Sequence, residues 1–222
     1  MDTDEPTDPE QRFAEMRRNM VDRQLRARGI DDPAVLTAFG DLPRHLFVPE
    51  DQRPNAYADR PLPIGRGQTI SQPYIVALMV QELGVSSDDR VLDVGSGSGY
   101  QTAVLATLAR HVCAVERMPD LAERAIGLLG QLGVANVTFR TGDGSLGCPE
   151  EAPFERIICG AGAPEIPDAW VDQLTDGGRI VAPVGDTGVQ TLVAVDKTGN
   201  KTRRRTICDV RFVKLIGRQG WG

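Results

Sequence analysis

Apolar and polar positions follow two patterns along the chain, one typical of helices and one typical of strands. They are most regular from residue 71 to residue 183. Apolar side chains at helical spacing follow Ser71-Gln72-Pro73 and stop at Gly84, which predicts a helix. Beyond it, short apolar runs typical of buried strands alternate with helical patterns. The expected elements are strand 91–94, a helix to about 109, strand 112–116, helix 119–132, strand 137–141, strand 154–159, helix 165–175 and strand 179–183. This alternation predicts a parallel sheet with helices on both faces.

The pattern changes near the C-terminal end of the chain. Residues 190–196 and 206–216 are both apolar in strand fashion, and a Thr-Gly-Asn turn lies between them. Two strands joined through such a turn predict an antiparallel hairpin at the sheet edge. The expected fold class is therefore α/β, a doubly wound and mostly parallel seven-stranded sheet with a C-terminal antiparallel hairpin.

The first 71 residues are less regular. Residues 11–28 predict a helix that ends at Gly29, and Asp32 followed by Pro33 predicts the capped start of a short helix to about Phe39. Prolines and glycines interrupt residues 41–71, which predicts a long, ordered loop. We expect residues 1–10 to form a disordered acidic tail, and residues 11–222 to form one domain in which residues 11–71 cover the active site.

Composition excludes several classes of function. The net charge of −6 leaves no broad basic surface for nucleic acid, and Arg203–Arg205 is the only basic run, expected at a solvated strand or turn edge. No apolar stretch reaches the roughly 20 residues that span a bilayer, and the acidic N-terminus does not resemble a signal peptide. We therefore expect no nucleic-acid partner and no membrane association.

The cysteines and histidines indicate neither a metal site nor a disulfide framework. The four cysteines (113, 148, 159 and 208) show no C-x-x-C spacing, and Cys113 and Cys159 fall within apolar strand patterns. The two histidines have no partner at metal-ligand spacing. We expect buried thiols, no metal and a cytoplasmic location.

The turn after the strand at 91–94 carries the strongest chemical signal. Gly95, Gly97 and Gly99 allow close approach of a ligand at a strand's carboxyl end, but the third glycine comes one residue too early for a dinucleotide fingerprint. Asp93, two residues before the turn, disfavours a pyrophosphate and suits a cationic donor. This pattern favours S-adenosylmethionine, which carries a sulfonium and an ammonium.

Two further acids are expected at the same edge of the sheet. Glu116 ends the next strand, 21 residues after Gly95, near the spacing at which an acid binds ribose hydroxyls. Asp143 and Gly144 end the third strand, where an acceptor oxygen could take the adenine amine. The alternatives are strand-end acids that only solvate the fold, a plain Asp-Gly turn, or a nicotinamide or flavin site.

Two loops bear on the acceptor. Residues 159–167 hold small residues and prolines but no aromatic side chain, which argues against stacking of a flipped base and leaves space for a chain-like acceptor. Ser71 precedes the helix at Pro73, so it either caps that helix or takes part in the chemistry. A helix N-terminus can also bind a carboxylate, so the two roles are compatible.

These motifs together resemble the protein-L-isoaspartate O-methyltransferase family. The matching segments are Gly67–Tyr74, Val91–Thr102, Val115-Glu116, Gly142–Gly144, Ala163–Pro167 and Val210–Leu215. The resemblance implies a Rossmann-like class I methyltransferase that methylates the α-carboxylate of L-isoaspartyl residues in damaged proteins. The resulting ester closes to a succinimide, which partly reopens as aspartate.

The resemblance also implies roles for individual residues. Ser71 matches the active-site serine. The expected cofactor-binding residues are Gln68, Thr69, Ile70, Asp93, Gly95, Ser96, Gly97, Gly99, Glu116, Arg117, Asp143 and Gly144. Lys214 stands where the family usually has proline, so it either attracts a carboxylate or faces solvent.

Other functions stay open from the sequence. A related enzyme could esterify ordinary aspartate in a specific peptide, and a class I enzyme could methylate a small molecule or RNA. A protein that binds adenosylmethionine without catalysis is a third alternative. The expected partners are isoaspartyl peptides and proteins, and the expected oligomeric state is a monomer.

Overall fold

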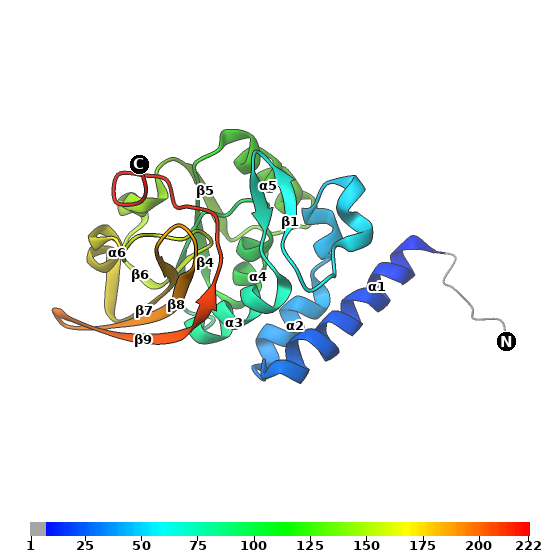
Figure 1. The fold of residues 1–222 in the computed structure, drawn as a ribbon, viewed down its shortest axis with the longest axis horizontal. Coiled ribbons are helices and arrows are strands. Elements are labelled where there is room, and N and C mark those ends of the chain that lie inside the picture. Colours follow the sequence, from blue (N-terminus) through cyan, green and yellow to red (C-terminus); the bar gives the residue numbers. More distant parts are fainter. Residues whose placement is uncertain (1–7) are drawn as a thin grey trace.

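A seven-stranded sheet forms the centre of the computed structural model, which describes residues 8–222 (Figure 1). The strands lie in the order β5-β4-β3-β6-β7-β8-β9. Their bounds are β3 Arg90–Val94, β4 His111–Glu116, β5 Val137–Thr141, β6 Phe154–Cys159, β7 Leu174–Gly185, β8 Gln190–Thr198 and β9 Lys201–Val210. Strands β5, β4, β3, β6 and β7 are parallel, whereas β8 and β9 pair antiparallel. The predicted fold class is confirmed.

Helices cover both faces of the sheet, as the alternation predicted. One face carries α3 (Pro73–Leu83), α4 (Tyr100–Leu108) and α5 (Pro119–Gln131), and the other carries the short α6 (Asp168–Gln173). Neighbouring side chains of β3 point to opposite faces, with Val91 in one buried cluster and Leu92 in the other. The sheet therefore separates two apolar cores.

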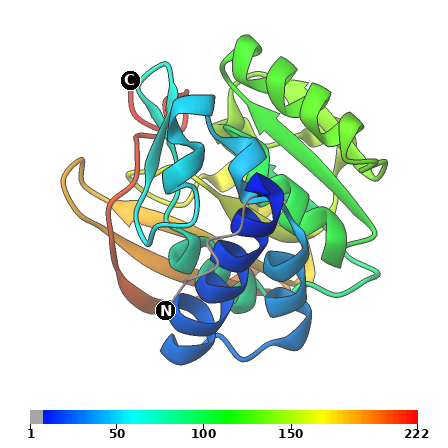
Figure 2. The same ribbon diagram turned by 90° about the vertical axis from the view of Figure 1, so that its right-hand side faces the viewer.

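The N-terminal segment packs outside the helices of the first face. Helix α1 (Pro9–Asn19) continues as a π-helical turn (Met20–Leu25) and a 3-10 turn (Arg26–Arg28) up to Gly29, and α2 (Pro33–Asp41) follows. Figure 2 shows α1 running across the outside of the molecule. Asp32 caps α2 as predicted, because its side chain accepts bonds from the main-chain N–H groups of Ala34 and Val35. Residues 1–7 of the predicted disordered tail lie outside the described residues.

Residues 8–10 are ordered, contrary to the expected tail over 1–10, because Asp8 accepts a bond from Glu10 N and α1 starts at Pro9. Residues 41–71 are ordered, but they are not one loop. They contain 3-10 helices at Arg44–Phe47 and Glu50–Asn55, then a hairpin of β1 (Leu62–Gly65) and β2 (Gln68–Ile70). The strands of this hairpin are too short to produce a visible alternation in the sequence.

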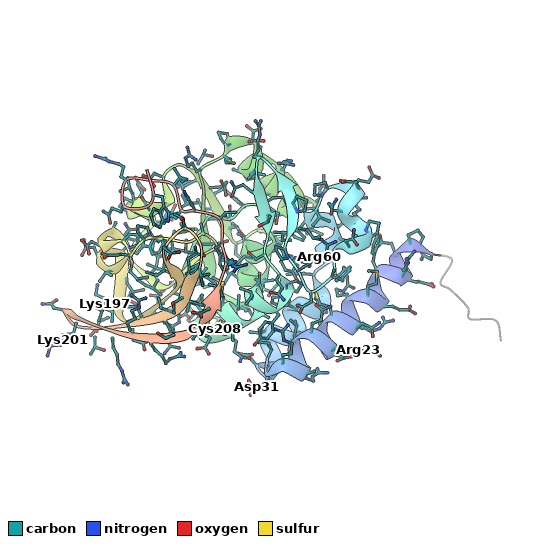
Figure 3. The ribbon with its side chains drawn as sticks, in the orientation of Figure 1. Arg23, Asp31, Arg60, Lys197, Lys201 and Cys208 are labelled. Atoms are coloured by element: carbon teal, nitrogen blue, oxygen red, sulfur yellow. The ribbon has the colours of Figure 1, made fainter. Side chains whose placement is uncertain are left out.

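Three predicted boundaries are wrong for local reasons. Gln72 is the residue before α3 and no side chain caps this helix, so Ser71 is not its cap. Helix α6 begins at Asp168 and not at 165, because Pro167 disfavours a helical conformation of the residue before it. The last strand covers Lys201–Val210 instead of 206–216, since the exposed Arg203–Arg205 run belongs to the pairing. Figure 3 shows this strand passing from Lys201 at the outer tip of the hairpin to Cys208 nearer the body.

The helices and the cysteines of residues 8–222 bear on the class of protein. No helix in this range has the length and apolar content needed to cross a membrane. All four cysteines are free thiols, and Cys113 and Cys159 are fully buried, as predicted.

Candidate active site

A cleft with three adjoining lobes opens beyond the carboxyl ends of the parallel strands, where ligands of such sheets bind. Thr69 and Gly160 belong to the walls of all three lobes, so the lobes are continuous. The large lobe, of about 640 Å³, contains Ser71. The Glu116 lobe has a volume of about 80 Å³, and the Ser96 lobe one of about 30 Å³.

The glycine turn after β3 forms the floor between the lobes. Gly95 N donates to Val115 O over 2.8 Å, which fastens the turn to the neighbouring strand β4. Glu116, at the end of β4, accepts bonds from Gly97 N over 2.8 Å and from Met118 N over 2.9 Å. These bonds fix its carboxylate in the lobe wall, and each oxygen keeps capacity for a further donor.

Asp93 lies beneath this turn and not in the cleft wall. It is fully buried, and Gln101 Nε2 donates to its Oδ1 over 2.7 Å. Burial raises the pKa of Asp93 to about 6, although hydrogen bonds from Thr102 and Gln101 oppose the shift. Its carboxylate therefore supports helix α4 and the turn from below.

Asp143 is likewise turned away from the lobes. It accepts bonds from Ser145 N, Ser145 Oγ and Arg218 N. Burial acts to raise the pKa of Asp143, but these hydrogen bonds prevail and hold it below its ordinary value. The next residue, Gly144, does line the Glu116 lobe. A Cβ on Gly144 would lie 2.6 Å from Val94 Cγ1, so only glycine lets this turn approach β3 so closely.

Gly99 is also outside the lobe walls, and its role is packing. It has φ +83°, and a Cβ there would lie 2.9 Å from Ala125 Cβ on α5. The third glycine of the turn thus allows α5 to approach the start of α4, and it leaves ligand contact to Gly95 and Gly97.

The hairpin segment supplies the opposite wall. Gln68 and Thr69 line the Glu116 lobe, Ile70 lines the Ser96 lobe, and Ser71 lines both the large and the Ser96 lobes. Within residues 8–222, the Ser71 hydroxyl makes no hydrogen bond, so it is available to a ligand. Of the segment 11–71 that we expected to cover the site, only residues from Pro61 onward line these lobes, and helices α1 and α2 do not.

Most of the predicted site residues come together. Ser71, Gln68, Thr69, Ile70, Gly95, Ser96, Gly97, Glu116, Arg117 and Gly144 line the lobes. Asp93, Gly99 and Asp143 do not, so Glu116 is the only one of the three expected rim carboxylates that faces the cleft. The rim is not uniformly acidic, because Arg117 and Lys214 share the wall of the Glu116 lobe.

The resemblance implied that the last strand, Val210–Leu215, helps form the acceptor region, but the sequence did not predict that residues 213–216 line the Glu116 lobe. The residues after β9 cross the cleft, with Val213 in two lobes and Lys214–Ile216 along the Glu116 lobe. Lys214 is exposed, its Nζ lies 5.9 Å from the centre of the Trp221 ring, and it is absent from the large lobe. Gly160 was within reach of sequence analysis, since it belongs to the small-residue loop already singled out.

The chemistry of these groups suits a nucleoside with a cationic tail. The free acceptor capacity of Glu116 fits a pair of ribose hydroxyls, and the glycine turns at Gly95–Gly97 and Gly144 leave room for a ligand against the main chain. In the described part of the chain, no cluster of three or more His, Cys, Asp or Glu side chains is placed to hold a metal ion.

Comparison with known proteins gives a consistent result. The sequence profile of the family described as protein-L-isoaspartate(D-aspartate) O-methyltransferase matches residues 15–220. The protein-L-isoaspartate O-methyltransferase of Methanoculleus marisnigri is 52% identical over 205 residues, which are 92% of this chain and 93% of that protein. Protein-L-isoaspartate O-methyltransferase 1 of Syntrophobacter fumaroxidans is 50% identical over 209 residues, which are 94% and 98% of the two chains.

Solved structures agree with the sequence relatives. A protein-L-isoaspartate O-methyltransferase matches with a TM-score of 0.82 and 29% identity, over 92% of this chain and 67% of the other. A Plasmodium falciparum structure described as the same kind of enzyme, in complex with S-adenosyl-L-homocysteine, matches with a TM-score of 0.79 and 28% identity. That match covers 90% of this chain and 98% of the other.

Proposed function

The chain belongs to the protein-L-isoaspartate(D-aspartate) O-methyltransferase family, and from this membership we propose how its cleft divides between donor and acceptor. The enzyme depends on S-adenosylmethionine and methylates isoaspartyl residues, which begins their repair. We place the methyl donor in the Glu116 lobe and the α-carboxylate of the isoaspartyl residue beside Ser71 in the large lobe.

One observation carries this division. The Glu116 lobe and the large lobe share Thr69, Gly160 and Val213 in their walls, so a donor in one meets an acceptor from the other at these residues. The large lobe has the volume of an ordinary ligand site, and its walls include the apolar side chains of Ile75 and Phe212. These features suit an extended peptide.

The acceptor needs little chemical activation. A carboxylic acid has an unperturbed pKa of about 4, so the acceptor is already ionised at neutral pH and needs no general base. When bound, adenosylmethionine supplies an electrophilic methyl group on sulfur. What the protein contributes is alignment and exclusion of water. Ser71 holds the acceptor carboxylate through its free hydroxyl.

The remaining site residues hold the donor. Glu116 accepts the ribose hydroxyls, Gly144 provides room for the adenine, and the Gly95–Gly97 turn receives the methionine part. Asp93 and Asp143 support the site without contacting the donor. The oxygens of Asp93 already accept bonds from Gln101 and Thr102, and those of Asp143 accept bonds from Ser145 and Arg218.

The Glu116 lobe is smaller than the roughly 300 Å³ of typical ligand sites. Because the lobes are continuous, a donor bound there also occupies part of the adjoining lobes. We also propose that the protein is a monomer and that it lies in the cytoplasm. The four free thiols fit the reducing environment of that compartment.

Replacing the serine tests the assignment of the acceptor. Ser71→Ala should lower kcat by roughly 10- to 100-fold, because a hydrogen bond to a charged group contributes about 1.5–3 kcal/mol. Affinity for S-adenosylhomocysteine, measured by calorimetry, should change less than about twofold. Ser86→Ala, in the turn before β3, is the matched control and should leave both unchanged. Weakened donor affinity with normal turnover would show that Ser71 does not hold the acceptor.

A further inference from the structure

The molecule contains a buried guanidinium that the reaction scheme above does not use. Arg44, in the 3-10 helix Arg44–Phe47, is 0% exposed. Among residues 8–222, no carboxylate lies within ion-pair distance of it. A buried charge without a counter-ion is unfavourable unless hydrogen bonds satisfy it, and packing alone would be served better by an apolar side chain.

Main-chain carbonyls take the place of a counter-ion. Arg44 Nε donates to Ala56 O over 2.7 Å, and Arg44 Nη2 donates to Ser71 O over 2.7 Å. The side chain thus connects three segments of the N-terminal region, at residues 44, 56 and 71. The second bond fixes the peptide plane that follows the proposed acceptor serine.

The guanidinium also contacts Tyr100, at the start of the helix that follows the glycine turn. Arg44 Cζ lies 4.8 Å from the centre of the Tyr100 ring, a distance typical of a cation–π contact. Tyr100 is the first residue of α4, directly after Gly99, and it is 1% exposed. Phe39 and Phe47 meet its ring edge-on, with centroids 5.7 and 5.3 Å away, and so hold it in place.

The charge persists at neutral pH. Burial lowers the pKa of Arg44 only to about 10. The hydrogen bonds to both carbonyls and the contact with the ring are therefore those of a charged side chain in the working enzyme.

We propose that Arg44 is a positioning residue that sets the place of Ser71 relative to the glycine turn. It does so by holding the Ser71 carbonyl while resting on Tyr100. Arg44 touches neither donor nor acceptor; it acts through the serine. This inference rests on the acceptor role of Ser71 proposed above.

Substitution by lysine separates geometry from charge. Lysine keeps the charge but lacks the planar fork that reaches two carbonyls and lies flat on a ring. Arg44→Lys should lower kcat/KM for an isoaspartyl peptide by roughly 10- to 100-fold, because a displacement of about 1 Å has effects of that size. Its affinity for S-adenosylhomocysteine should stay within about twofold of the wild type.

The deciding measurement is a double-mutant cycle with Ser71→Ala. If Arg44 acts through Ser71, the double variant should be no slower than Ser71→Ala alone. Multiplicative losses would overturn the inference while leaving the acceptor role intact. If Ser71→Ala by itself costs nothing, the proposed acceptor role fails first, and the positioning role fails with it.

Two controls guard against loss of folding. Arg179, whose Nε lies 2.6 Å from Asp196 Oδ1 and whose Nη1 donates to Glu82 O, is remote from the cleft, so Arg179→Lys should keep normal kcat/KM. If Arg44→Lys fails to fold, Tyr100→Leu offers a second test, because it removes the ring that supports the guanidinium. It should give the same loss of kcat/KM. Combined with Ser71→Ala, it should lower kcat/KM no further than Ser71→Ala does alone. An unchanged kcat/KM in a folded Tyr100→Leu variant would overturn the inference.

Discussion

The side chain of Thr102 donates a hydrogen bond of 2.6 Å to Asp93 Oδ2 in the fully buried layer under the glycine turn. Gln101 donates to the other oxygen, so helix α4 is tied to the end of β3 by a fully buried carboxylate. The turn to which we assign the donor therefore lies on a buried acid, and the protonation of that acid affects folding.

The first prediction concerns this acid. The pKa of Asp93 is about 6 in the folded protein against an ordinary value of 3.8, so between these values the folded chain holds a proton that the unfolded chain has lost. Stability from this group is complete below pH 4 and is lost as the pH rises through 6. Asp93→Asn cannot titrate. Between pH 4 and pH 7 the free energy of unfolding of the wild type should therefore fall by about 2 kcal/mol relative to that of Asp93→Asn.

Urea unfolding of both proteins at the two pH values measures this difference. A difference that stays constant with pH would show that the pKa of Asp93 is not raised.

The second prediction concerns Glu116. Glu116→Ala removes the acceptor that we assign to the ribose and also the bonds from Gly97 N and Met118 N. The dissociation constant for S-adenosylhomocysteine should rise by roughly 10- to 100-fold, by the usual energy of a hydrogen bond to a charged group. Glu123→Ala, on the exposed face of α5, should bind normally. Titration calorimetry that finds equal affinities for both variants would remove the ribose assignment.

The third prediction concerns Gly144. An alanine Cβ there would lie 2.6 Å from Val94 Cγ1, so Gly144→Ala should lower the free energy of unfolding by about 1–3 kcal/mol and weaken donor binding. Gly127, inside α5, has nothing within 4 Å of an added Cβ. Gly127→Ala should instead stabilise the protein by about 0.5–1 kcal/mol and leave donor binding unchanged. Thermal and urea unfolding measure both, and a tolerant Gly144→Ala variant would contradict the close approach.

The sequence predicted the elements whose signals are local. The buried run at Val91–Val94, the αL residue Gly84 and the cap at Asp32 each act within a few residues, and all three lie where the pattern placed them. The cysteine pattern likewise predicted buried thiols at Cys113 and Cys159, and the glycine turn lies in the wall of the cleft. Class and topology follow from such local signals because βαβ units leave few alternatives.

Contacts between segments that are distant in the chain could not be predicted from the sequence. Asp143 is turned from the cleft because Arg218, 75 residues later, donates to it. The wall at Lys214–Ile216 depends on where the chain goes after β9 ends at Val210. The start of β9 was misplaced because an edge strand tolerates the exposed Arg203–Arg205 run. The bond from Arg44 to Ser71 spans 27 residues and leaves no periodic mark in the sequence.

The central claim is that the large lobe presents an isoaspartyl carboxylate to the donor. Its most direct test is methyl transfer from labelled adenosylmethionine to two peptides of the same sequence, one with an L-isoaspartyl residue and one with normal aspartate. The account predicts methylation of the isoaspartyl peptide and only background label in its twin, with the difference greatly reduced in Ser71→Ala. Equal methylation of the two peptides, or preference for the normal one, would contradict it.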